Sequence, residues 1–199
     1  MKIDNNFINS FNKLSLDQNG VFTLPDLNSI ISPTSKVDLY RQIKKLTTQD
    51  ILFRLTRGIY ITSNFSIETL VVSITPEAYL SLEYALAYHN MIGTYANKKI
   101  RPIITSNIKP IEKNDIIIEF KKIQRKLVFG FNIVKGIRIA NKEKALLDTL
   151  YFYQSGTKFY FDIYSDIDIE DLDRDLIQTY LKKYKNPKFV KFVEEYLNG

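Results

Sequence analysis

The sequence contains no cysteine and only one histidine, His89. The absence of cysteine excludes disulfides, thiolate nucleophiles and zinc or iron–sulfur sites with cysteine ligands. A single histidine also excludes a His-rich metal centre. We therefore expect no cofactor and no metal site.

Long apolar runs, glycine and proline are also scarce. The chain has no stretch of about 18 apolar residues, the length that a membrane-spanning helix needs. The polar first residues, MKIDNNFINSFNKL, lack the apolar segment of a secretory signal peptide, so we expect a cytoplasmic protein without membrane contact. With 7 glycines and 6 prolines in 199 residues, long disordered linkers are not expected.

The net charge of +6 is unevenly distributed along the chain. Residues 1–65 carry +3, residues 66–96 carry −3, residues 97–145 carry +9 and residues 146–199 carry −3. A basic centre with an acidic C-terminal part fits nucleic acid at one face and a protein partner at another. A solvated lysine-rich surface has the same distribution, so charge alone does not separate the two interpretations.

The segment Phe22–Ile61 has the clearest order of predicted elements. Hydrophobic spacing, caps and turn residues predict a helix over 3–14, a second helix that Phe22-Thr23-Leu24-Pro25 opens and that runs through Ile31, and a third over 34–48, followed by a hairpin over 51–61. Either Thr34 or Ser35 caps the third helix, and Arg57-Gly58 lies at the tip of the hairpin. This is the order of elements in a winged helix-turn-helix, and it indicates double-stranded DNA as the partner.

The third predicted helix has an apolar face and a basic face. The apolar face holds Leu39, Tyr40, Ile43 and Leu46, and the opposite face holds Thr34, Asp38, Arg41 and Lys45. The major groove of B-DNA admits one such helix, which needs one face for its own core and one for the duplex. The predicted DNA contacts are Thr34, Ser35, Lys36, Arg41, Lys44, Lys45, Arg54, Arg57 and Gly58.

In this interpretation Arg41 and Lys45 reach bases or phosphates, and the helix N-terminus at Thr34–Ser35 meets phosphate. Gly58 lets the hairpin turn approach the DNA. Asp38 either pairs with Arg41 or accepts a hydrogen bond from a cytosine amino group. The alternative is a winged helix that contacts protein through an ordinary lysine-rich face.

Beyond residue 63 the pattern changes to mixed helices and strands. Thr75-Pro76-Glu77 is typical of a helix start, and we expect that helix to continue to His89, with Asn90 as its left-handed cap. Strands are predicted over 101–106, 115–122, 126–134 and 137–140, and helices over 143–153, 169–183 and 187–197. We therefore expect an α+β protein with a winged helix-turn-helix domain over 1–63 and a mixed α/β domain over 64–199.

Two patterns suggest catalysis only weakly. The sequence places no carboxylate or nucleophile beside His89, so a structural role is expected for it. Asp115, Glu119 and Lys121 resemble the carboxylate–lysine pattern of metal-dependent nucleases, but both acids lie close together on one predicted strand. We expect no catalytic residues and no enzyme activity.

Aromatic residues are concentrated within 151–164. They are Tyr151, Phe152, Tyr153, Phe159, Tyr160, Phe161 and Tyr164. We expect most of them in the core, with a partner surface as the alternative. The acidic run Asp162–Asp175 is either a solvated helix entry or a site for a basic partner.

Three segments are informative through their order and spacing: LTRGIY (55–60), PEAYLSLEYALAYH (76–89) and ANKEKALLD (140–148). They resemble, in turn, the L-x-R-G-[IV]-Y wing, the P-x-x-Y-[IL]-S-x-x-[SY]-A-L-x-x-H helix and the A-x-x-E-K-A-[LI]-x-D segment of AbiEi-type antitoxins of abortive-infection toxin–antitoxin systems. The chain departs from this family at Asn90, where the family usually has glycine. Asparagine tolerates the left-handed conformation.

The resemblance implies an antitoxin that represses its own operon by binding operator DNA through the winged helix. It also implies that the C-terminal domain counters a nucleotidyltransferase-like toxin of the AbiEii type. Glu143, Lys144 and Asp148 belong to the third motif, although the residues alone suggest only a helix start and a buried polar contact. Two alternatives stay open: a stand-alone winged-helix regulator whose C-terminal domain senses a ligand or dimerises, and a nuclease that uses Asp115 and Glu119.

Overall fold

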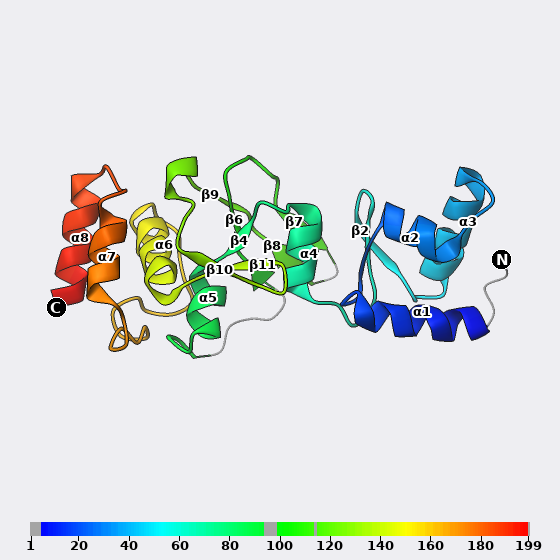
Figure 1. Cartoon of the computed structure of the whole chain (residues 1–199), viewed down its shortest axis with the longest axis horizontal. Coiled ribbons are helices and arrows are strands. Elements are labelled where there is room, and N and C mark those ends of the chain that lie inside the picture. The colour runs from blue at the N-terminus through cyan, green and yellow to red at the C-terminus, as the bar shows by residue number, and fades with distance from the viewer. Residues whose placement is uncertain (1–4, 94–98, 114, 199) are drawn as a thin grey trace. The chain divides into compact units, whose positions relative to one another are not determined.

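The computed structural model describes residues 5–93, 99–113 and 115–198 (Figure 1). Within these ranges the chain forms eight α-helices, one short 3-10 helix and three small sheets, which confirms the predicted α+β class. The chain divides into two compact units: Met1–Pro76 with Lys113–Asp115, and Glu77–Glu112 with Ile116–Gly199. Across the described ranges, no helix is both long and apolar enough to span a membrane.

The first unit begins with the predicted helices and hairpin. Its elements are α1 (Asn5–Asp17), β1 (Val21–Thr23), α2 (Leu24–Ile31), α3 (Lys36–Thr48), β2 (Phe53–Thr56), β3 (Ile59–Ile61) and α4 (Ile67–Ile74). The three strands form one antiparallel sheet in the order β1-β3-β2. The predicted first helix also included residues 3 and 4, which lie outside the described residues. The predicted domain boundary at 63–64 precedes α4, whose residues belong to this unit.

Side-chain caps determine where α2 and α3 begin. Thr23 and Asp26 form a capping box, in which the Asp26 carboxylate accepts the Thr23 N–H at 2.7 Å. Ser35 is the cap of α3, because its hydroxyl accepts the N–H of Asp38 at 3.1 Å. Each such cap contributes about 1 kcal/mol.

One apolar cluster holds the first unit together. It contains Phe11, Phe22, Leu27, Ile31, Leu39, Ile43, Leu46, Leu52 and Tyr60. Leu39, Ile43 and Leu46 are spaced four and three residues apart, so α3 buries one face against α1 and α2. The opposite face of α3 is therefore left to solvent.

The second unit is built around short strands and three C-terminal helices. Its elements are β4 (Tyr79–Leu80), α5 (Leu82–Tyr88), β5 (Lys99–Ile100), β6 (Ile103–Ile104), β7 (Ile111–Lys113), β8 (Ile116–Ile118), β9 (Lys121–Lys122), η1 (Arg125–Leu127), β10 (Phe131–Val134), β11 (Ile137–Ala140), α6 (Lys142–Gln154), α7 (Arg174–Leu181) and α8 (Pro187–Asn198). One sheet has the order β10-β11-β4-β6-β9 and the other β5-β8-β7. In Figure 1, α5, α7 and α8 surround α6, which is the most buried helix of the unit.

The predicted helix start at Thr75-Pro76-Glu77 is wrong. Thr75 is instead the C-cap of α4, and α5 begins only after Ser81. Between them Tyr79 and Leu80 form β4, which pairs with β11 and β6. Sheet pairing with strands far along the chain thus overrides a strong local helix signal.

Other predictions for the second unit differ in accuracy. The predicted strand over 126–134 is partly wrong, because 125–127 form the 3-10 helix η1 and only 131–134 pair as β10. The strand over 137–140 is confirmed. Asn90 has a φ of 59°, which confirms the predicted left-handed residue.

Candidate nucleic-acid interface

The solvent-facing side of α3 presents most of the predicted DNA contacts. Its exposed residues include the four predicted cations Lys36, Arg41, Lys44 and Lys45. Thr34 and Ser35 are exposed just before the first turn, where Thr34 donates its N–H to the Asp38 carboxylate at 3.3 Å. The helix thus combines a buried apolar face with an exposed basic one.

Asp38 does not belong to the exposed face, contrary to the prediction. Its side chain is only 8% exposed, whereas that of Arg41 is 66% exposed. Arg41 Nη2 donates to Asp38 Oδ1 at 2.6 Å, so the predicted pairing of these residues is confirmed. The Arg41 guanidinium holds the pKa of Asp38 below its usual value.

The hairpin of β2 and β3 supplies the remaining predicted contacts. Arg54 and Arg57 are exposed, and the strand register shifts between Arg54 and Thr56. Gly58 has a φ of 78°, and its carbonyl accepts the N–H of Leu24 at 2.9 Å, which ties the turn to the start of α2. An added Cβ at Gly58 would meet no atom within 4 Å, so backbone conformation alone requires glycine there.

A hollow of about 490 Å³ lies between α3 and the hairpin. It is lined by Leu24, Lys36, Tyr40, Arg54, Arg57, Gly58 and Tyr60. Three cations from two separate elements, Lys36, Arg54 and Arg57, therefore meet around one concave surface. Arg41 and Lys45 do not line it, so the predicted contacts fall into two groups within this unit.

Sequence reasoning missed two exposed residues of α3. Tyr40 was predicted on the apolar face, but it is 45% exposed and lines the hollow. Val37 is 80% exposed although it is apolar. The exposure of Val37 could have been predicted from its position in the helix. It is two residues before the buried Leu39, and residues two apart in a helix do not share a face.

In the second unit, the residues of the motif segments meet in a buried charge network. Lys144 and Asp148 lie one turn apart on α6, have no exposed side-chain surface and form an ion pair. The Asp148 carboxylate also accepts hydrogen bonds from the hydroxyls of Tyr79 and Ser81, each at 2.9 Å. The Lys144 ammonium donates in addition to the Tyr184 hydroxyl at 3.3 Å.

Burial acts on both charges of this network. It lowers the pKa of Lys144 and raises the pKa of Asp148, because a low dielectric disfavours each charged form. The ion pair, the hydroxyl donors and the Phe129 ring, whose centroid is 4.6 Å from Lys144 Nζ, offset this cost. The network is closed to solvent, so its geometry supports a structural role.

Further contacts join the same two segments and fix the next helix. His89 Nε2 lies 2.7 Å from the carbonyl oxygen of Ala140, so the single histidine connects the end of α5 to the end of β11. The Glu143 carboxylate accepts the N–H of Asp173, the cap of α7, at 3.2 Å. These contacts give His89 and Glu143 structural partners within the second unit.

The nuclease-like pattern does not form on one strand, contrary to the prediction. Asp115 lies in the turn before β8, with a φ of 63°, and Glu119 follows the end of β8. Glu119 pairs with Lys121 at 2.6 Å and with Arg101 at 3.4 Å, and these cations hold its pKa below the usual value although burial alone would raise it. The described ranges contain no group of three or more His, Asp or Glu side chains that could hold a metal ion.

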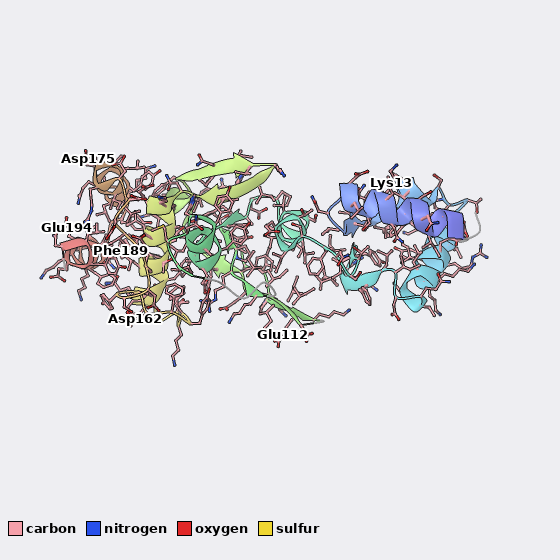
Figure 2. The ribbon with its side chains drawn as sticks, turned by 90° about the horizontal axis from the view of Figure 1, so that it is seen from below. Lys13, Glu112, Asp162, Asp175, Phe189 and Glu194 are labelled. Carbon is pink, nitrogen blue, oxygen red and sulfur yellow. The ribbon has the colours of Figure 1, made fainter. Side chains whose placement is uncertain are left out.

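The aromatic run 151–164 is divided between core and surface. Tyr151, Phe152, Phe159 and Phe161 are buried or packed against the core, whereas Tyr153, Tyr160 and Tyr164 are exposed. Acidic residues lie on the same unit, and Figure 2 shows Asp162, Asp175 and Glu194 at its periphery, around α7 and α8. Figure 2 also marks Phe189, which is buried and packs edge-to-face on Tyr151 of α6.

Neither a comparison with protein-family models nor a search of curated proteins finds a match to this chain.

Proposed function

We propose that the first unit is a winged helix-turn-helix that binds double-stranded DNA, with α3 in the major groove and the β2–β3 hairpin as the wing. The observation that carries this proposal is the meeting of Lys36, Arg54 and Arg57 around one hollow beside the exposed face of α3. Cations that converge from two elements suit a phosphate backbone, which dominates the affinity of DNA-binding proteins. Arg41, Lys44 and Lys45 then lie along the helix that enters the groove.

Fluorescence anisotropy with a labelled duplex from upstream of the gene tests this proposal. Arg41→Ala and Arg57→Ala, alone and combined, should weaken binding, and each lost phosphate contact should lower the slope of log K against log salt by about 0.9. Lys13→Ala is the matched control, because Lys13 is an exposed cation of the same unit on α1 (Figure 2). Unchanged affinity in the double variant would overturn the assignment of this surface.

We further propose that the chain is an AbiEi-type antitoxin, which represses its own operon through the first unit and counteracts a nucleotidyltransferase-like toxin through the second. Support comes from the resemblance of the segments 55–60, 76–89 and 140–148 to the motifs of that family. The last two segments also share one buried network, through Tyr79, Ser81 and Asp148. If the segments 76–89 and 140–148 define one domain, their residues are expected to pack together.

Co-expression with the neighbouring gene tests the antitoxin proposal. If that gene encodes a nucleotidyltransferase-like toxin, the chain should restore growth, and a pull-down then shows whether rescue involves direct contact. Loss of rescue on deleting residues 77–199 would assign the effect to the second unit, provided that the remaining part accumulates at normal levels. A neighbour that is harmless when expressed alone would favour a stand-alone regulator instead.

A further inference from the structure

The pairing of Asp38 with Arg41 is asymmetric. Arg41 is 66% exposed on α3, yet one of its N–H groups is bound at 2.6 Å by a carboxylate that is almost wholly buried. Ion pairs between two exposed side chains hold neither partner in one place. Here the buried partner is fixed, so the pair gives the exposed guanidinium a defined direction.

Contacts on several sides keep Asp38 in place. Its Oδ2 accepts the backbone N–H of Thr34 at 3.3 Å, and its Oδ1 accepts Nε2 of Gln42 at 3.3 Å as well as Arg41. Its own N–H is bound by the Ser35 hydroxyl at the helix cap. A carboxylate engaged in this way is directed into the unit and not toward a cytosine amino group.

Arg41 keeps donors for a second partner. A guanidinium has five N–H donors in a planar fork, and Asp38 binds through one nitrogen, Nη2. Two parallel N–H groups are what guanine O6 and N7 accept in the major groove. Arg41 is the sixth residue of α3, in the N-terminal half from which recognition helices reach base edges.

We propose that Asp38 is a positioning residue that orients Arg41 to read a guanine in the major groove. This inference rests on the proposed DNA-binding function of the first unit. Among the described residues, no carboxylate forms an ion pair with Lys36, Lys44 or Lys45, the other cations of α3. These three lysines then supply sequence-independent attraction to phosphate. Asp38 therefore contributes to the choice of base rather than to overall affinity.

The proposal is tested first by selecting the duplexes that the protein binds from a random library of about 20 base pairs. The affinity for the selected site and for its single-base variants is then measured. The wild type should require guanine at one position per bound unit, with a preference of about 5- to 150-fold over other bases. Asp38→Asn and Arg41→Lys should each lose most of that preference, because each removes the directed fork. The salt dependence of Asp38→Asn should stay that of the wild type.

A control variant and a double variant show whether a change in the guanine preference comes from lost positioning of Arg41, from unfolding or from the change in net charge. Asp50→Asn removes one exposed carboxylate from the same unit and should keep the preference. The preference is a ratio of two affinities of one protein sample, so partial unfolding cancels from it. Asp38→Asn combined with Arg41→Ala should show the same preference as Arg41→Ala alone, because the two residues act as a unit.

If Asp38→Asn keeps the full guanine preference, with or without tighter binding to the selected site, then Asp38 only neutralises the charge of Arg41. That result would overturn the positioning role of Asp38 and leave the DNA-binding function standing. If the wild type enriches no duplex and binds none, the DNA-binding function and this inference both fail.

Discussion

Removing the Asp148 carboxylate should destabilise the second unit strongly. Asp148→Asn leaves the Lys144 ammonium in a site with no exposed surface and without its counter-charge. Breaking a buried pair by removing one partner costs about 3–5 kcal/mol. A whole domain is stable by only about 5–15 kcal/mol, so this single change should remove a large part of the free energy of unfolding.

The chain offers a matched comparison for this prediction. Lys191 and Glu195 on α8 have the same i,i+4 spacing, but their side chains are 76% and 65% exposed. Glu195→Gln should therefore cost at most about 0.5 kcal/mol. Helical spacing and change of charge are the same in both cases, so the difference reports burial.

Urea unfolding followed by circular dichroism gives the measurement, with the near-ultraviolet signal reporting the tyrosines packed around the network. Lys144→Met combined with Asp148→Leu should cost less than Asp148→Asn, because no uncompensated charge stays buried. The double variant still leaves the Tyr79 and Ser81 hydroxyls without an acceptor, at about 1–3 kcal/mol for each group that stays unpaired. A cost below about 1 kcal/mol for Asp148→Asn, or a double variant as costly as the two single ones together, would refute the reasoning.

Three further predictions concern the first unit. Gly58→Ala should cost about 1 kcal/mol through backbone conformation alone, since its φ is 78° and an added Cβ has free space; urea unfolding checks this, and a loss several times larger would mean a clash. Ser35→Ala should cost about 1 kcal/mol in the same assay by removing the cap of α3, whereas Ser35→Asp should keep it. Because Arg41 lowers the pKa of Asp38, the stability contributed by this pair is present above the unfolded-state pKa and is lost only as the pH falls through the lowered pKa of the folded state. The guanine preference should accordingly be the same at about pH 7 and about pH 5, and a preference already lost at pH 5 would contradict the assignment.

Local signals predicted the elements of the first unit well because each signal acts within a few residues. Thr23, Pro25 and Ser35 mark helix starts through contacts to residues three or fewer positions away. The hairpin is likewise set by its own turn, where Gly58 supplies the positive φ. The predicted third helix and the hairpin therefore agree with the structure. The strand β1 was not predicted, and residues 22 and 23, which the prediction gave to the start of the second helix, belong to it and pair with β3.

The same local reasoning failed where distant residues decide the outcome. Thr75-Pro76-Glu77 has the composition of a helix start, but Tyr79 lies in a strand and its hydroxyl is bound by Asp148, 69 residues away. Burial of Asp38 and exposure of Tyr40 also depend on how α3 meets its neighbours. Helical spacing predicts which residues share a face, but it does not decide which residue at the edge of that face is covered.

The chain has two ion pairs between residues on adjacent turns of one helix, Asp38–Arg41 on α3 and Lys144–Asp148 on α6. They differ in burial, and this difference separates a candidate interface from a structural network. In α3 the acid is buried and the cation is exposed, so Arg41 still has donors to offer to a ligand. In α6 both Lys144 and Asp148 are closed to solvent, so neither can contact a partner without opening the unit. If the second unit acts on a toxin, its contacts must come from exposed side chains rather than from these motif residues. Substitutions of exposed residues such as Tyr164 should then impair neutralisation without loss of stability, whereas substitutions of Asp148 should impair it only through unfolding.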